Sequence, residues 1–296
     1  MNYKNLFVGV DIGGTKISIV FFKRNKIIKK IKLKTNSLYG PKNAEIIADN
    51  LLVYKKNIKK IGIATTGIIE NGKWSVLNKK IIGDFKNFPL VEQIKKKINK
   101  PVFAFGDTEA AALGELKFGA GKQFSDFFYI TISTGVGGSM VIDRKPFTKI
   151  SSLGGVFGHM VIRQNGKLCG CGRRGCIEAY ASGNAIDQIL KKSNKKNIST
   201  KSMLLSYKDT KWSMKIINEA TTYIAEGIVN VNSLTGISNF IIGGSIGLSH
   251  NFFREIINNT KKITKRKIFI IKAGLKNDSE VFGCLAKSMM KKVKYE

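Results

Sequence analysis

The sequence predicts an α/β protein built from two similar domains. Two stretches, 6–22 and 127–142, each read as an apolar strand, a turn of small residues and a second apolar strand. In addition, the apolar strand 101–105 is followed by an alanine-rich helix, an order that is typical of layered α/β folds. We therefore expect an N-terminal domain over 1–117, joined by a C-terminal helix at about 279–296, and a larger domain over 118–278.

The first half of the chain reads mainly as strands. The apolar runs 6–10 and 17–22 predict a β-hairpin, and a third strand continues to residue 34 across a turn at Asn25. Residues 41–56 carry apolar side chains at helical spacing, which predicts an amphipathic helix. The runs 61–64 and 101–105 predict two further buried strands, and the helix after the second begins near Thr108.

The second half mixes strands and helices. The runs 127–132 and 139–142 predict the second hairpin, and 240–242 and 267–272 predict two more strands. Helical spacing predicts helices at 185–190, 212–234 and 279–290. The segment 194–208 is polar, and we expect a surface excursion there.

Composition bounds the class of protein. A chain of 296 residues with 43% hydrophobic residues can bury sizeable cores, and no apolar run is long enough to span a membrane. The start of the sequence does not resemble a secretory leader, and few cysteines fit a reducing cytoplasm, so we expect a cytoplasmic protein. The net charge of +31 comes mostly from lysines spread along the chain, which favours a solvated basic surface over a specific nucleic-acid face.

The turn of the first hairpin has the chemistry of a phosphate site. Adjacent glycines let backbone amides approach a phosphate closely, the next two residues add donors, and a leading carboxylate suits Mg²⁺. A tight hairpin without ligand is the alternative for this turn alone. The candidate residues are Asp11, Gly13, Gly14, Thr15 and Lys16.

Two later turns also follow apolar strands and are rich in glycine and hydroxyl residues. The second hairpin turns at Ser133, Thr134, Gly135 and Gly137, and a further turn follows strand 240–242 at Gly243, Gly244 and Ser245. Paired strand–turn–strand units predict that both domains offer amides to one polyphosphate. The stretch 67–73 reads G-x-x-x-x-G-K, but a tryptophan follows where a P-loop needs Ser or Thr, so it is not a P-loop.

Asp107 follows a strand directly and precedes a helix. A carboxylate in this position faces the ligand-binding edge of an α/β sheet. The alternative is a helix N-cap without chemistry.

One histidine and three cysteines form the pattern H-x9-C-x-C-x4-C, with His159, Cys169, Cys171 and Cys176. Zinc prefers such a tetrahedral set of thiolates and imidazole. The alternative is a group of buried or disulfide-bonded cysteines, but three cysteines cannot pair evenly. The glycines at 170, 172 and 175 spell the dinucleotide fingerprint G-x-G-x-x-G, which requires a strand before it and a helix opening at it; here cysteines occupy positions between the glycines, so the match is accidental. Cys284 and His250 lie outside this pattern and are interpreted as a buried thiol and a surface residue.

These motifs resemble the ROK family of bacterial sugar kinases and repressors. Gly158-His159, the cysteine loop 169–176, Glu178 and the sequence Ala-Ser-Gly at 181–183 match the family signature. The resemblance implies an actin-like ATPase fold (a duplicated RNase H-like fold) with an interdomain cleft. It also implies that Asp107 is the general base, that His159 and Glu178 contact sugar hydroxyls, that Gly67 lies in the sugar pocket floor, and that the turn at 243–245 binds adenosine.

Within the family the resemblance is strongest to members that phosphorylate the 6-hydroxyl of N-acetyl-D-mannosamine in amino sugar catabolism. It implies ATP, Mg²⁺ and structural Zn²⁺ as ligands and a homodimer as the assembly. Two positions depart from the family pattern: Gly106 stands where Asn is common, and Val156 stands where Glu or His is usual. Each change removes a side chain that can form a hydrogen bond to the sugar in other family members. Other hexose kinases, such as glucokinase or fructokinase, are therefore the alternative.

Proteins without catalysis are less favoured. ROK repressors carry a helix-turn-helix region before the first phosphate motif, and this sequence has five residues before its first predicted strand. A basic nucleic-acid-associated protein with an inactive kinase fold is a further alternative; mutation of Asp107 would separate it, because binding would persist although no activity ever appeared. We expect a small-molecule sugar as the partner, with no specific nucleic acid and no membrane.

Overall fold

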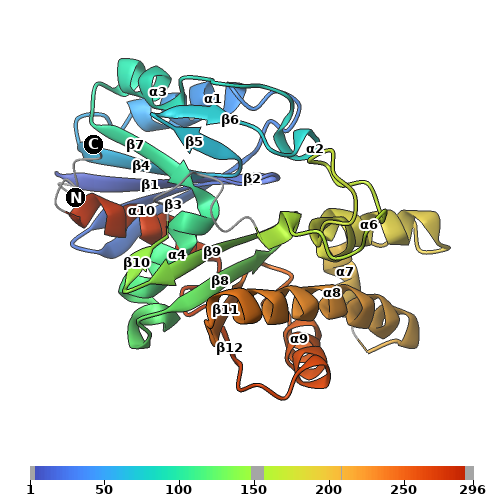
Figure 1. The fold of residues 1–296 in the computed structure, drawn as a ribbon. Coiled ribbons are helices and arrows are strands. Elements are labelled where there is room, and N and C mark those ends of the chain that lie inside the picture. Colours follow the sequence, from blue (N-terminus) through green and yellow to red (C-terminus); the bar gives the residue numbers. More distant parts are fainter. Residues whose placement is uncertain (1–3, 148–156, 208, 291–296) are drawn as a thin grey trace. The chain divides into compact units, whose positions relative to one another are not determined.

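The computed structural model describes residues 4–147, 157–207 and 209–290. These residues form two compact α/β units, each with a five-stranded mixed sheet (Figure 1). Unit 1 takes its described residues from Met1–Lys122 and Asp278–Glu296, and unit 2 takes them from Gln123–Phe147 and Gly154–Asn277. The predicted α/β class is confirmed.

The sheet of unit 1 has the strand order β3-β2-β1-β4-β7. β1, β2 and β3 form an antiparallel meander, whereas β1, β4 and β7 run parallel. The main elements are β1 (Leu6–Ile12), β2 (Lys16–Lys23), β3 (Lys26–Lys34), α1 (Lys42–Leu52), β4 (Ile58–Thr65), α3 (Leu90–Ile98), β7 (Val102–Gly106), α4 (Asp107–Phe118) and α10 (Ser279–Met289). Between β4 and α3 lie the small hairpin β5 (Ile68–Glu70) and β6 (Lys73–Ser75) and the short helix α2 (Lys79–Ile82).

Alternation along β1 divides the two faces of this sheet. Val8 and Val10 point into one core, which they share with apolar residues of α1 and α3 such as Ile47 and Ile94. The other face is covered by α10, which packs on β1, β4 and α4. At Gly283 of α10 a Cβ atom would lie only 1.8 Å from the backbone oxygen of Ala110 in α4, so the two helices can approach this closely only through glycine.

Unit 2 repeats this topology with the strand order β10-β9-β8-β11-β12. β8 pairs antiparallel with β9 and parallel with β11, as β1 does with β2 and β4. The elements are β8 (Phe127–Ile132), β9 (Val136–Ile142), β10 (Lys145–Pro146), the turn η2 (Phe157–His159), α5 (Glu178–Ala181), α6 (Gly183–Lys192), α7 (Thr200–Ser206), α8 (Lys211–Thr235), β11 (Asn239–Gly243), α9 (His250–Ile263) and β12 (Phe269–Lys272).

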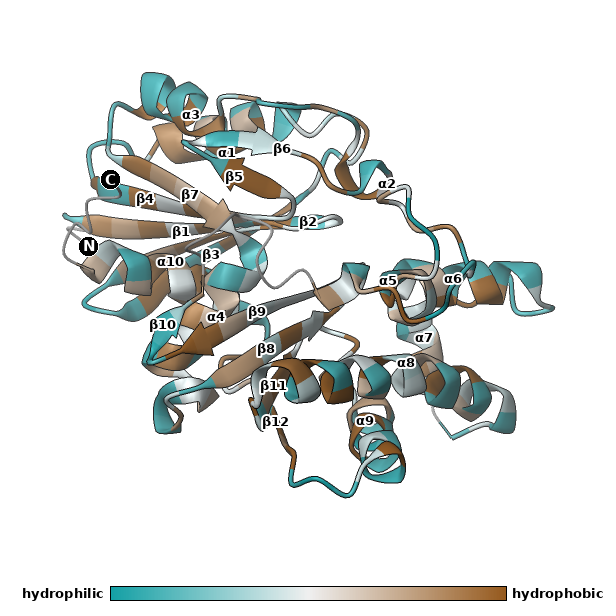
Figure 2. Ribbon diagram, viewed as in Figure 1, coloured by the Kyte–Doolittle hydropathy of each residue, from teal (hydrophilic) through white to brown (hydrophobic). Residues whose placement is uncertain are grey.

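The core of unit 2 lies between its sheet and the long helix α8. Residues such as Ile130 of β8 and Ile224 of α8 are fully buried in it. Figure 2 shows brown and teal alternating along α8, as expected for a helix with one buried face. Within the described ranges no helix combines the length and the apolar character needed to cross a bilayer.

The prediction of an irregular surface excursion at 194–208 is wrong for its second half. Helix α7 occupies Thr200–Ser206 and buries Met203 and Leu204. Ser199 caps this helix, because its side chain accepts a hydrogen bond from Ser202 N. A two-turn helix that buries so few apolar residues produces only a weak periodic signal in a polar sequence.

Candidate active site

The first glycine turn joins β1 to β2 in unit 1. Gly13 N donates to Lys16 O (3.0 Å), which closes the turn. Thr35, a buried residue just after β3, donates from Oγ1 to Gly13 O (2.7 Å) and from its backbone N to Thr15 O (3.3 Å). The turn is therefore supported from the neighbouring strand. Sequence patterns gave no reason to single out Thr35, since its role depends on the pairing of β2 with β3.

Three parallel strands of unit 1 end at one edge. Ile12 pairs with Thr65, and Thr65 pairs with Gly106, so the segments that follow these residues leave the sheet side by side. This edge is where α/β sheets bind ligands. It brings together the predicted residues Asp11, Gly67, Gly106 and Asp107.

Carboxyl groups from three elements interact at this edge. The pKa of Asp11 rises to about 7, first because burial disfavours its charge and second because Asp107 is nearby, while Lys16 acts in the opposite direction. The pKa of Glu280, in the first turn of α10, is raised well above its ordinary value, first by burial and then by Asp11. Glu280 was not singled out in the sequence, because α10 is remote from the other two acids along the chain.

The raised pKa of Asp11 predicts a pH-dependent gain of stability in Asp11→Asn. A carboxyl whose folded pKa is about 7 and whose ordinary value is 3.8 supplies stability below pH 4 that is lost as pH rises through 7. In metal-free buffer we expect the asparagine variant to have a higher Tm than wild type at pH 8 and no gain at pH 4. Asp49→Asn removes an exposed carboxylate that pairs with Lys97, and this control should give no gain in Tm at pH 8. Equal Tm values of Asp11→Asn and wild type at both pH values would contradict the assignment.

The start of α4 tests the N-cap interpretation of Asp107. Gly106 is the N-cap residue, with extended backbone angles, and Asp107 is the first residue of the helix, so the N-cap alternative is wrong. Its Oδ1 accepts a hydrogen bond from Thr108 N (2.8 Å). The carboxylate therefore lies beside the amino-terminal end of a helix, where the helix dipole is positive.

Two predicted glycines near this edge differ in their surroundings. Gly67 has a φ of +96°, and a Cβ atom on it would lie 2.4 Å from Ser75 O, so a side chain is excluded there. A Cβ atom on Gly106 would meet nothing within 4 Å. Space for a larger side chain is thus available immediately before Asp107.

The second glycine loop joins β8 to β9 in unit 2. Its predicted residues are Ser133, Thr134 and Gly135, while Gly137 already belongs to β9 and pairs with Thr131. The hydroxyl oxygens of Ser133 and Ser245 lie 3.3 Å apart, so the loop touches the turn formed by Gly243, Gly244 and Ser245 after β11. The two glycine turns that the sequence predicts in this unit are therefore neighbours.

The histidine and cysteines of the predicted zinc site are brought together. Their donor atoms all lie within 4.8 Å of one another, and His159, Cys169 and Cys176 are buried. Cys169 Sγ lies 3.5 Å from His159 Nδ1, and the sulfurs of Cys171 and Cys176 are 3.8 Å apart, much longer than a disulfide bond. The disulfide alternative is excluded for these cysteines, all of which are free.

The electrostatics of this cluster suit a cation with soft ligands. Burial lowers the pKa of His159, and the charge of Arg173 adds to this effect while Glu178 opposes it, which favours the neutral imidazole that binds metals. Burial raises the pKa of Cys169 to about 12, so a thiolate there requires a nearby positive charge. A Cys3His donor set with this spacing fits zinc in a closed structural site.

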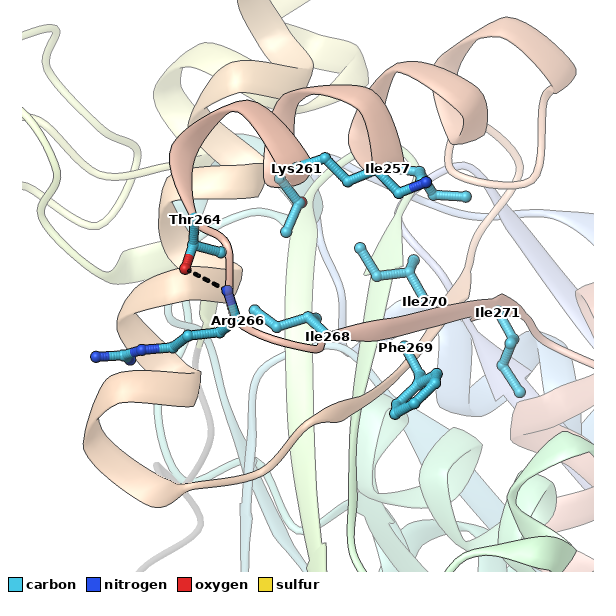
Figure 3. A pocket seen from close by; sticks show the side chains of 9 residues that line it. Ile257, Lys261, Thr264, Arg266, Ile268, Phe269, Ile270 and Ile271 are labelled. Atoms are coloured by element: carbon cyan, nitrogen blue, oxygen red, sulfur yellow. Dashed lines mark hydrogen bonds between the residues drawn. The ribbon is translucent and has the colours of Figure 1, made fainter.

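A cavity of about 230 Å³ lies elsewhere in unit 2, between α9 and β12 (Figure 3). Apolar side chains such as Ile257 and Ile270 line it, together with Lys261 and Arg266. None of the residues predicted for catalysis or binding contributes to it. It is therefore separate from the candidate active site.

Comparison with known proteins supplies the family. A family model described as the ROK family matches residues 7–290. The chain belongs to the ROK family. The N-acetylmannosamine kinase of Pasteurella multocida (strain Pm70) is 32% identical over 247 residues, which is 83% of each chain. That of Vibrio cholerae serotype O1 (strain ATCC 39315 / El Tor Inaba N16961) is 32% identical over 254 residues, covering 84% of this chain and 87% of the relative.

Solved structures confirm the predicted fold of this ROK protein. A ROK family glucokinase from Streptomyces griseus, in complex with glucose and AMPPNP, superimposes with a TM-score of 0.82 at 26% identity, over 96% of this chain and 100% of that chain. The fold is therefore the actin-like ATPase fold. Of the residues predicted for the site of this ROK protein, Val156 lies outside the described residues.

Proposed function

We propose that this ROK protein is an ATP-dependent sugar kinase that phosphorylates the 6-hydroxyl of N-acetyl-D-mannosamine. The observation that carries the proposal is the position of Asp107, at the carboxyl edge of the unit 1 sheet and in the first turn of α4. The close match to N-acetylmannosamine kinases over most of the chain supports the sugar.

Asp107 is the proposed general base. Its carboxylate accepts the proton of the 6-hydroxyl while the hydroxyl oxygen forms a bond to the γ-phosphorus of ATP. The bond between that phosphorus and the β–γ bridging oxygen breaks, and ADP leaves with the electron pair. Phosphoryl transfer needs such a residue mainly to orient the nucleophile.

The glycine turns are proposed to bind the nucleotide. In unit 1, Gly13 and Gly14 offer amides, with Thr15 and Lys16 as further donors. In unit 2, the loop at 133–137 takes phosphates, and Gly243, Gly244 and Ser245 take the adenosine. Thr15, directly before β2, and Lys16, the first residue of β2, are exposed, as ligand binding requires.

Two metal ions are part of the proposal. The raised pKa of Asp11, in a half-buried group of acids, fits a divalent cation, and Mg²⁺ held there would supply positive charge against the phosphates. Zinc held by His159 and the three cysteines stabilises the loop that precedes Glu178. His159 and Glu178 are proposed to face sugar hydroxyls, with Gly67 in the pocket floor.

The choice of sugar is the finer part of the proposal. Gly106 and Val156 remove two side chains that other family members use in the sugar pocket, so glucose or fructose is the alternative substrate.

We propose that the protein works as a homodimer in the cytoplasm. Light scattering of the purified protein tests whether it is a dimer. The lysine-rich surface is proposed to be solvated, without a specific nucleic-acid ligand.

The direct test is ADP release from zinc-replete protein with Mg-ATP and five sugars: N-acetylmannosamine, N-acetylglucosamine, glucose, mannose and fructose. We expect the highest kcat/KM with N-acetylmannosamine. A clear preference for another hexose assigns the alternative substrate. No phosphorylation of any of the five sugars would overturn the proposed activity.

Gly106→Asn should improve sugar binding. The open space at Gly106 accepts a side chain, and asparagine is a favourable N-cap residue for α4, so the fold should tolerate it. One added hydrogen bond to a sugar hydroxyl is worth on the order of 1 kcal/mol, so we expect KM for the sugar to fall about fivefold. Gly106→Ala fills the same space without a polar group and should leave KM unchanged. An unchanged KM in Gly106→Asn would place the sugar away from this residue.

A further inference from the structure

The second glycine loop is held in place by hydrogen bonds from two sides. Gly183 N and Asn184 N, at the start of α6, donate to Ser133 O (2.8 Å) and Thr134 O (3.2 Å). On the side of β11, Ile246 N and Gly247 N both donate to Ile132 O, at 3.0 and 3.1 Å. The conformation of the loop therefore depends on its neighbours as well as on its own sequence.

At Val136, the first residue of β9, the loop contacts the segment that carries the predicted zinc ligands. Val136 N donates to Glu178 Oε2 over 3.0 Å, and both residues are buried. The backbone oxygen of Val136 packs against Gly158, where a Cβ atom would lie only 1.9 Å away. Both contacts come from residues at or next to the proposed sugar ligands, since Gly158 precedes His159.

Glu178 bonds to a backbone N–H of the loop through its side chain, so substitution can remove this bond. The bonds from the start of α6 and from Ile246 and Gly247 join backbone atoms and cannot be removed singly, and the hydroxyl contact of Ser133 with Ser245 involves no backbone atom of the loop. If this bond is lost, a buried N–H remains unpaired, which disfavours the present loop conformation.

We propose that Glu178 is the positioning residue of the second glycine loop and that it holds the loop in its phosphate-binding conformation. This rests on the proposed function, in which the loop takes the phosphates of ATP and Glu178 contacts the sugar. The carboxylate of Glu178 then contacts the sugar directly and affects nucleotide binding through the loop. Because coupling between two ligands is reciprocal, occupation of the sugar site should change nucleotide affinity and the reverse.

Two conservative substitutions separate the hydrogen bond from the charge. Glu178→Gln keeps a side-chain oxygen at the same distance from Cα and loses the charge. Glu178→Asp keeps the charge but shortens the side chain by one methylene group. The readout is the Kd of Mg-ADP, measured calorimetrically on full-length, zinc-replete protein without sugar. We expect Glu178→Asp to raise Kd about tenfold, which corresponds to about 1.4 kcal/mol, and Glu178→Gln to bind as wild type does.

Asp187 in α6 provides the matched control. It also accepts a hydrogen bond from a backbone amide of unit 2, with its Oδ1 lying 2.8 Å from Thr200 N, but this bond does not involve the loop. Asp187→Ala should lower Tm and leave the Kd of Mg-ADP unchanged. Zinc content and Tm of every variant show whether the fold and the metal site are intact.

The Mg-ADP affinity measurement can fail independently of the sugar phosphorylation test. Wild-type affinity in Glu178→Asp, or an equal loss in Glu178→Gln and Glu178→Asp, overturns the positioning role, even if the enzyme phosphorylates a sugar. A raised Kd in Asp187→Ala also overturns it, because the effect would then be general destabilisation. Failure of wild type to phosphorylate any sugar removes the proposed activity but leaves the nucleotide measurement valid.

Discussion

Asp107→Asn is expected to lower kcat for sugar phosphorylation by roughly 10²- to 10⁴-fold, the usual contribution of a positioned general base. Asparagine has nearly the same shape as aspartate, and its side-chain oxygen can still accept the hydrogen bond that Asp107 Oδ1 accepts from Thr108 N. It cannot take a proton from the hydroxyl. The KM for ATP should change little, and the coupled release of ADP measures both constants.

The control for this variant is Glu109→Gln, two residues further along α4. Glu109 pairs with Lys287 of α10 at 3.2 Å, so its neutralisation removes an acid of the same helix without touching the proposed chemistry. We expect wild-type kcat from this variant. Substantial kcat in Asp107→Asn, or an equal loss in both variants, would show that Asp107 is not the base.

Loss of the zinc site should have the second large effect. In Cys169→Ser we expect loss of bound zinc, a Tm lower by about 10 °C or more, and no sugar kinase activity. The donor atom of Cys169 is buried 3.5 Å from His159 Nδ1, and a serine oxygen is a poor replacement for a thiolate. We expect activity to be lost as well, because His159 is both a predicted zinc ligand and a proposed sugar contact. Metal analysis, calorimetry and the ADP assay check the three parts.

Cys284→Ser is the matched substitution outside the cluster. Cys284 is a buried thiol of α10 whose Sγ lies 3.8 Å from Val10 O, and it is not among the ligands. Zinc content should be unaffected in this variant. Full zinc content and wild-type Tm in Cys169→Ser would contradict a structural metal at this site.

Features that depend on neighbours in sequence could be predicted well. The hairpin turn between β1 and β2, the helix that follows β7 and the ligand pattern from His159 to Cys176 are each encoded in one short stretch of sequence, where periodicity and spacing carry the information. The buried position of Cys284 also follows from its place on the apolar face of a helix. Ligand roles for these residues stay predictions, as does the domain boundary near residue 118.

Features that depend on remote pairing could not be predicted in this way. Glu280 reaches the acids Asp11 and Asp107 only because α10 packs on β1 and α4. The bond between Val136 and Glu178 joins two segments that are separated by the whole zinc loop. Helix α3 was also missed, because its lysine-rich surface hides the apolar positions Ile94 and Ile98 that it buries.

The contact between Gly283 and Ala110 has a consequence for the order in which the protein can be made. Helix α10 comes from the far end of the chain, yet it covers one face of the first sheet to be translated. During synthesis the apolar face of this sheet therefore stays exposed to solvent until Ser279–Met289 has left the ribosome and can cover it. The described residues of unit 2, by contrast, all lie between 123 and 277, so that unit can close its core first.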